Sequence, residues 1–249
     1  MTKHAVGLNQ RQIVHREIWN KKATIRLLYR DFHEQLVEAC PEGRVLDIGG
    51  GTAHIKDFRR DIVSTDILLF PGIDVVADAH RLPFRDGLFS GVIMLDVLHH
   101  LERPIEFLGE AARVLKPGGC LAMIEPAMTT IAWRFYDRFH EEPVDMNVDP
   151  FASVAVNPQR DPFDANQAIP TLLFATSPAR KRVEELIPSL RVRRVDWQSL
   201  IAYPMSGGFQ RWSLMPASLV HPLLAFERKI PELLRKHLAF RMMVVLERV

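Results

Sequence analysis

The sequence predicts an α/β fold with a doubly wound, mostly parallel sheet, an N-terminal helix and a C-terminal insertion. Two observations lead to this prediction. Between residues 44 and 125, short apolar runs rich in β-branched side chains alternate with helical segments. Such runs are typical of a parallel sheet that is covered on both faces. The first run also ends in three consecutive glycines, which allow a strand to turn sharply into a helix.

Each element of the first half follows from its pattern. Residues 9–40 predict one helix, because the apolar side chains recur at helical spacing and share one face. These side chains are Ile18, Ile25, Leu28, Phe32 and Leu36. Pro41 and Gly43 end this helix. Strands are expected at residues 44–48, 61–66, 73–77, 90–95 and 120–124, and helices at 53–60 and 104–115.

After Glu125 the regular alternation stops and prolines become frequent. We expect residues 140–175 to form a lid or binding loop, since long irregular segments of compact domains often carry function. A linker without fixed structure is the alternative. The remaining expected elements are a strand at 191–195, a helix over 217–237 and a last strand at 240–246. The prediction is one domain over residues 1–249, with a cofactor-binding half at 44–125 and an irregular substrate or lid region at 126–237.

Composition narrows the class of protein. The 249 residues are 47% hydrophobic and 25% charged, which argues against disorder, collagen-like fibre and a disulfide scaffold. The formal net charge is only +2, so nucleic acid is not an expected partner. Cys40 and Cys120 form neither a disulfide framework nor a metal motif, which favours the cytoplasm. We see no signal peptide and no uninterrupted membrane-spanning run.

The most informative stretch is VLDIGGGTAHI, at residues 45–55. Gly49 and Gly51 would let a ligand approach the backbone closely. A dinucleotide fingerprint needs a third glycine where this chain has His54. Asp47, at the end of the strand, would also repel a pyrophosphate. A nicotinamide oxidoreductase is therefore disfavoured.

Three carboxylates follow three consecutive expected strands. They are Asp47, Asp66 and Asp78. An acid at the end of the second strand can hold both ribose hydroxyls, and an acid beside the glycine loop suits a cationic amino group. This set indicates a nucleoside that carries positive charge and no phosphate, and S-adenosylmethionine has these properties.

Several motifs together resemble the class I S-adenosylmethionine-dependent methyltransferases, in particular the type 11 small-molecule branch. The motifs are VLDIGGGTA at 45–53, STD at 64–66, ADAHRLPFRDGLFSGVIMLDVLHHL at 77–101 and RVLKPGG at 113–119. The resemblance covers about residues 44–125. It implies a seven-stranded Rossmann-like methyltransferase fold, a methyltransferase activity and S-adenosylmethionine as the cofactor.

The resemblance also implies residue roles. Asp47, Gly49 and Gly51 would surround the methionine part of the cofactor. Asp66 would hold the ribose, with Ile67 against the adenine, while Asp78 would contact the adenine amino group beside Ala79. Asp96 is a further cofactor contact. The family usually has glycine where this chain has Ala53, which puts the packing of the loop in doubt.

Structural alternatives stand beside these roles. Asp47 could cap the helix after the glycine loop, Asp78 could be a turn residue, and Asp96 could cap a short helix around His99. Trp19, Tyr29 and Phe32 either close over the cofactor or belong to the core.

Candidate catalytic residues are His99 and His100, which follow the fourth strand, where open α/β sheets bind their ligands. Histidine is the usual base near neutral pH, although packing or loop support is the favoured explanation of the pair. Glu125 could bind a substrate hydroxyl or cap the chain that follows. The His140–Glu142 cluster matches no known metal loop, so we predict a solvated loop and no metal.

Substrate evidence is limited to the apolar segment 197–226 and the basic clusters around it. Apolar surface beside basic residues can dock on an anionic membrane or take a lipid-linked acceptor. The YPMSGGF stretch at 203–209 resembles methyltransferases of surface-polysaccharide and glycolipid pathways. An ordinary core with solvated charges is the favoured alternative. The hypothesis is methyl transfer to a small-molecule or lipid- or glycan-linked acceptor, and the rival is a non-catalytic binding or regulatory module.

Overall fold

The computed structural model describes residues 3–139, 142–157 and 159–249. In these residues seven strands form one sheet in the order β3-β2-β1-β4-β5-β7-β6. Strands β1 to β5 pair in parallel, whereas β7 is antiparallel to both β5 and β6. The predicted doubly wound, mostly parallel α/β fold is confirmed.

The first half alternates as expected. Its elements are α1 (Lys3–Lys21), α2 (Ala23–Glu38), β1 (Val45–Ile48), η1 (His54–Asp57), β2 (Val63–Asp66), β3 (Val75–Val76), β4 (Phe89–Leu95), η2 (Leu98–His100), α3 (Pro104–Val114) and β5 (Leu115–Pro126). The second half contains α4 (Thr130–Phe139), α5 (Ile169–Phe174), α6 (Ser177–Leu186), β6 (Leu190–Gln198), α7 (Ala202–Ser206), η3 (Ala217–Leu219), α8 (Val220–Glu227), α9 (Glu232–Leu238) and β7 (Arg241–Arg248).

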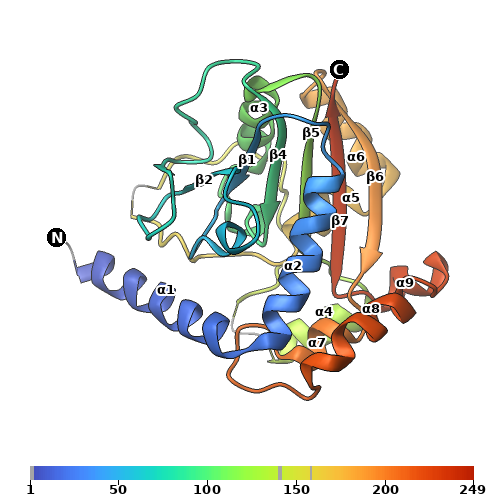
Figure 1. Cartoon of the computed structure of the whole chain (residues 1–249). Coiled ribbons are helices and arrows are strands. Elements are labelled where there is room, and N and C mark those ends of the chain that lie inside the picture. The colour runs from blue at the N-terminus through green and yellow to red at the C-terminus, as the bar shows by residue number, and fades with distance from the viewer. Residues whose placement is uncertain (1–2, 140–141, 158) are drawn as a thin grey trace.

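Helices cover both faces of the sheet, with α2 on one face and α3, α5 and α6 on the other (Figure 1). The central strands alternate side chains between two apolar clusters. In β4, for example, Val92 and Met94 pack on the α3 side while Ile93 packs on the α2 side. Both faces of each strand therefore need apolar residues, which explains the short apolar runs in the sequence.

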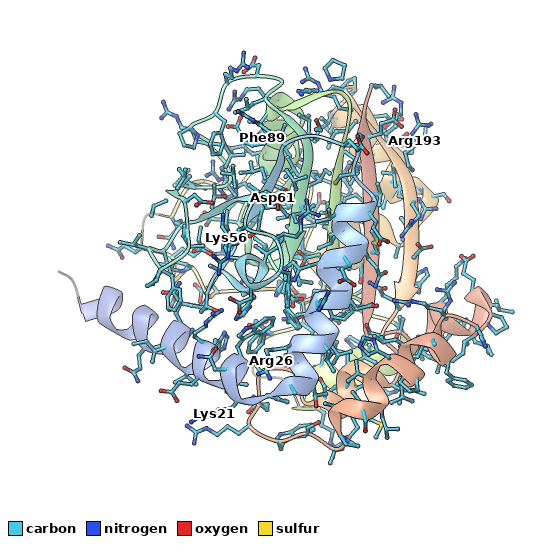
Figure 2. All side chains as sticks on the ribbon, in the orientation of Figure 1. Lys21, Arg26, Lys56, Asp61, Phe89 and Arg193 are labelled. Carbon is cyan, nitrogen blue, oxygen red and sulfur yellow. The ribbon has the colours of Figure 1, made fainter. Side chains whose placement is uncertain are left out.

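Figure 2 shows which labelled side chains lie in the interior and which lie at the surface. Phe89 lies inside the molecule and is only 1% exposed, whereas Lys21 and Arg193 lie at its outer edge. Asp47 belongs to the α2 side of the sheet, because it alternates with Leu46 and Ile48, which pack on the α3 side.

Four expected elements are corrected by the structure. The single helix at 9–40 is two helices, because Lys22 takes an extended conformation between them. The helix at 53–60 is only a short 3-10 turn. The strand expected at 120–124 begins earlier, at Leu115, and a register shift between Phe89 and Gly91 accommodates the extra residues. The helix at 217–237 is divided into η3, α8 and α9, and Pro231 precedes α9.

Candidate functional site

The glycine loop connects the carboxyl end of β1 to η1. Gly49 and Gly51 have φ values of +68° and +56°, which favour glycine over any residue with a side chain. A Cβ on Gly49 would collide with Val97. A Cβ on Gly50 would collide with Ser64 and come within 2.9 Å of Asp47 Oδ2. The loop therefore lies flat against the ends of β1, β2 and β4.

Ala53 also has a left-handed backbone, with a φ of +56°. The helix expected at 53–60 predicts a right-handed backbone at this alanine, and that prediction is wrong. The usual glycine of the resembling family would adopt this conformation without strain.

Asp47 is buried beneath this loop, with 4% exposure. Ser64 Oγ donates a hydrogen bond of 2.7 Å to its Oδ2. Burial raises the pKa of Asp47 to about 7, although the hydrogen bond from Ser64 acts in the opposite direction. The carboxylate is thus held without a cationic partner close enough to offset its burial, and an ammonium group would supply one. Among the residues that the structure describes, no side chain caps η1 by a hydrogen bond, so Asp47 is not its cap.

Asp66 ends β2 and faces the same loop. Its Oδ2 accepts a 2.8 Å hydrogen bond from Gly51 N, and its Oδ1 accepts one of 2.8 Å from Leu68 N. Burial raises the pKa of Asp66, while these backbone hydrogen bonds lower it. Ile67 beside it is 52% exposed, so an apolar surface is open next to the acid.

Asp78 takes a different position. Its Oδ1 accepts a hydrogen bond of 2.9 Å from His80 N and also lies 2.6 Å from His80 Nδ1. Asp78 is therefore a turn residue as well as a candidate ligand. The adjacent Ala79 is partly buried against the core cluster on the α3 side.

Asp96 follows β4 with a strained, left-handed φ of +60°. Its Oδ2 accepts a 2.7 Å hydrogen bond from Tyr29, and its Oδ1 forms an ion pair with Arg241. Arg241 is 1% exposed and lies 3.9 Å over the ring of Tyr203. The expected alternative of Asp96 as a cap of η2 is wrong, because η2 has no side-chain cap from this position.

Glu125 supplies the missing cap. Its Oε1 accepts hydrogen bonds from Val97 N at 2.8 Å and Leu98 N at 2.7 Å. Its Oε2 lies 2.7 Å from His99 Nδ1. Glu125 is fully buried, so it orients η2 and the histidine from behind.

The pKa values of the two candidate catalytic histidines are shifted in opposite directions. Burial alone would lower the pKa of His99, but the carboxylates of Glu125 and Glu142 raise it to about 10. Burial and the charge of His99 lower the pKa of His100 to about 4. At neutral pH His99 is therefore protonated and His100 is a neutral imidazole.

The helix α1 crosses the glycine loop. Gln12 Nε2 lies 3.5 Å from Gly51 O, and Arg16 Nη1 lies 3.4 Å from Thr52 O. The Trp19 ring stacks on His54 with centroids 4.0 Å apart. Trp19 of α1 and Tyr29 and Phe32 of α2 all lie in the apolar cluster on the α2 side of the sheet, so the core interpretation of these residues is confirmed.

Comparison with known proteins identifies the class. Residues 35–123 match the family model described as a methyltransferase domain. Demethylmenaquinone methyltransferase of Renibacterium salmoninarum is 37% identical over 103 residues, which cover 36% of this chain and 44% of that protein. A ubiquinone/menaquinone biosynthesis C-methyltransferase of Desulfotalea psychrophila is 32% identical over 120 residues, covering 39% and 49%.

A solved structure supports the fold. Geranyl diphosphate C-methyltransferase of Streptomyces coelicolor A3(2) has a TM-score of 0.51 at 11% identity, covering 89% of this chain and 80% of that one. The matches span about half the length of the curated relatives.

Residues 35–123 therefore match the methyltransferase domain family. The prediction of a class I, type 11 domain, for which S-adenosylmethionine is the cofactor, is confirmed for this segment. In the described ranges no helix combines the length and the apolar character needed to cross a membrane.

Three residues at the site were not anticipated in these roles. Arg241 was assigned only to the last strand region, Glu142 to a solvated loop, and Glu125 was not linked to His99. No local motif marks Arg241, which is distant in sequence from Asp96. For Glu125, its place at the carboxyl end of a strand next to β4 was a usable signal. His140 and Glu141 lie outside the described residues.

Proposed function

We propose that this chain transfers a methyl group from S-adenosylmethionine to a small-molecule acceptor. The observation that carries the proposal is the family match at 35–123 together with Asp47 and Asp66, two buried acids beside one glycine loop. Asp47 would bind the cofactor's ammonium group next to Gly49 and Gly51. Because a carboxylate oxygen has two lone pairs, Asp66 can keep its backbone hydrogen bonds and still accept the ribose hydroxyls.

The adenine would lie beyond the ribose. Ile67 offers an exposed apolar side chain to the ring, and Asp78 with Ala79 stands at the next strand end. Asp96 would approach the cofactor from β4. Its carboxylate is held by Tyr29 and Arg241. Asp96 would therefore keep these two partners and position the groups around the cofactor.

Bound S-adenosylmethionine would supply a methyl group activated by its sulfonium; the acceptor nucleophile would bond to that carbon while the carbon–sulfur bond breaks and leaves its electron pair on the sulfur. A proton leaves the acceptor. His99 already carries a proton at neutral pH, whereas His100 is neutral but weakly basic. Orientation and proximity of the two reactants therefore supply most of the acceleration, and His100 is the better proton acceptor of the two.

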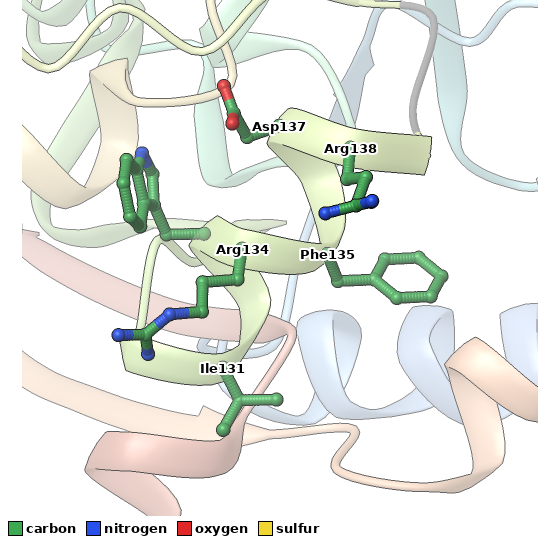
Figure 3. A pocket seen from close by; sticks show the side chains of 6 residues that line it. Ile131, Arg134, Phe135, Asp137 and Arg138 are labelled. Carbon is green, nitrogen blue, oxygen red and sulfur yellow. The ribbon is translucent and has the colours of Figure 1, made fainter.

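A lipid-linked acceptor, or a glycan carried on a lipid, is the finer proposal, and an exposed patch on α4 and α9 favours it. Ile131 and Trp133 of α4 are 45% and 41% exposed, and Leu233 of α9 is 73% exposed. Arg134 and Arg138 stand on the same helix and line a shallow pocket of about 540 Å³ with Ile131 and Trp133 (Figure 3). Apolar side chains beside cationic ones suit the surface of an anionic membrane.

The decisive experiment measures transfer of a labelled methyl group to a demethylated naphthoquinone with a prenyl tail, and to water-soluble phenols. We expect labelled product in at least one arm. Asp47→Asn and Asp66→Asn should weaken S-adenosylhomocysteine binding at least tenfold, whereas the exposed control Asp61→Asn should not. Tight cofactor binding without transfer to any acceptor would favour the rival binding module. Unchanged binding in both Asn variants would overturn the site.

Flotation with vesicles tests the lipid arm separately. Vesicles containing phosphatidylglycerol should carry the protein upward, and Trp133→Ala should reduce the floated fraction. Equal flotation with uncharged vesicles would refute the role of the cationic side chains, and no flotation with either kind of vesicle would leave a water-soluble acceptor as the conclusion.

A further inference from the structure

Three potential metal ligands converge beside η2. One ligand atom from each of His99, His100 and Glu142 lies within 4.8 Å of the others. His99 is 3% exposed, while the other two side chains are partly buried. The two rings lie with centroids 4.2 Å apart. This cluster is separate from the acids at the ends of β1 and β2.

The buried Glu125 fixes the direction of His99. It accepts two backbone hydrogen bonds on one oxygen and holds His99 Nδ1 at 2.7 Å with the other. The other ring nitrogen, Nε2, consequently faces Glu142, and a bound metal ion would displace the proton that this nitrogen carries at neutral pH. A carboxylate behind a histidine in this way is the recurring outer-shell arrangement of metal-binding histidines.

The distance between His99 Nε2 and Glu142 Oε2 is 3.6 Å. This separation is long for a hydrogen bond. It is close to the roughly 3.5 Å between two ligands of a tetrahedral ion whose bonds are about 2.0–2.2 Å long. A ligand atom of His100 lies within 4.8 Å of the ligand atoms of the other two residues, so small side-chain rotations would bring all three to one ion.

Glu142 is itself positioned by Gln167. The Gln167 amide donates to Glu142 Oε2, and Gln167 is 2% exposed. Its Oε1 has no hydrogen-bond partner among the described residues. A buried carbonyl oxygen without a partner is costly, and a bound ion with its water would remove that cost.

We propose that His99, His100 and Glu142 bind a divalent transition-metal ion. Two imidazoles and one carboxylate favour zinc, cobalt or iron over magnesium. Three protein ligands leave coordination positions open for water. If the proposed methyl transfer holds, an open position beside η2 would also take an oxygen of the acceptor. The proposal replaces the sequence expectation of a solvated loop without metal.

Titration calorimetry with zinc ion alone, on metal-stripped protein, tests the site. We expect one tight equivalent in the wild type. His100→Ala and Glu142→Gln should each weaken binding by at least tenfold, because both remove a ligand from a partly exposed position. His237→Ala on α9 is the matched control and should bind as the wild type does. Equal binding in all four proteins, or no stoichiometric binding in the wild type, would overturn the proposal.

The absorption spectrum of cobalt ion provides a test that needs no variant. Cobalt in a four- or five-coordinate protein site should give stronger visible bands than hydrated cobalt, and excess magnesium should not displace it. Glu125→Gln should reduce cobalt affinity about 10–100-fold. A spectrum equal to that of hydrated cobalt would refute the site. Neither experiment contains cofactor or acceptor, so their outcome is independent of the proposed methyl transfer.

Discussion

Binding of S-adenosylhomocysteine should become stronger as the pH rises through the titration of Asp47. The buried carboxyl has a pKa of about 7, and only the ionised form attracts the ligand's ammonium group. The ionised fraction is about 3% at pH 5.5 and about 50% at pH 7, so affinity should rise about 15-fold, or about 1.6 kcal/mol. This window lies below the range near pH 8 in which α-amino groups titrate.

The titration of Asp47 also determines how the stability of the fold depends on pH. Because the folded pKa of Asp47 lies above its unfolded value, the empty protein binds the proton more tightly than the unfolded chain does. This contribution to stability is fully present below about pH 4 and is lost as the pH rises through about 7. A bound ammonium group reverses the preference, so ligand binding near pH 6 should release about 0.9 proton per site.

Calorimetry in two buffers of different ionisation enthalpy measures both the affinity and the released protons. The Asp47→Asn variant should bind S-adenosylhomocysteine weakly, and its affinity should hardly change with pH. The asparagine side chain keeps the shape of the aspartate but carries no charge. Asp78→Asn is the control: hydrogen bonds from His80 outweigh burial and lower the pKa of Asp78, so this acid stays ionised throughout. A flat wild-type profile, or an unchanged slope in Asp47→Asn, would refute the reasoning.

Three further predictions concern stability and can be measured by chemical and thermal unfolding. Ala53→Gly should raise the free energy of unfolding by about 0.5–1 kcal/mol, and the Tm by about 1–4 °C, because the left-handed backbone strains alanine; a loss of stability would contradict this account. Arg241→Met should lower the free energy of unfolding by about 3 kcal/mol, because the buried Asp96 carboxylate then has no counter-charge. Adding Asp96→Asn to this variant should recover part of the lost stability. Purely additive losses from the two substitutions would argue against a coupling between the two side chains. A mild oxidant should join Cys40 and Cys120, whose sulfurs lie 2.8 Å apart, and raise stability by up to about 4 kcal/mol; mass spectrometry should find a loss of two hydrogens that Cys40→Ser abolishes, and free thiols after oxidation would contradict the predicted pairing.

Local patterns predicted the part of the fold that local physics determines. The runs at 44–48 and 90–95 became β1 and β4, because both faces of these strands are covered and both must be apolar. The glycine loop was equally predictable, since Gly49 and Gly51 take φ values near +60°, a conformation that favours glycine. The proximity of Asp47 and Asp66 could also be predicted, because the ends of neighbouring parallel strands meet at one edge of the sheet.

Other features depend on contacts that no local pattern records. The break at Lys22 contains neither proline nor glycine, and it arises where α1 leaves the core to cross the glycine loop. Glu142 reaches His99 from a segment without regular structure. Arg241 meets Asp96 across 145 positions of the chain. Such pairs become visible only when the sheet order is known.

The position of β7 has a consequence for synthesis of the chain. This strand is inserted between β5 and β6 and delivers Arg241 to the Asp96 carboxylate. While the ribosome is still making residues 127–240, β5 therefore presents an open apolar edge, and Asp96 lacks its counter-charge. Open strand edges are sites of mispairing. A nascent chain can thus form the glycine loop early, yet the ion pair of Asp96 with Arg241 is completed only when residues 241–248 have emerged, so the late insertion of one strand separates a partly folded intermediate from the native sheet.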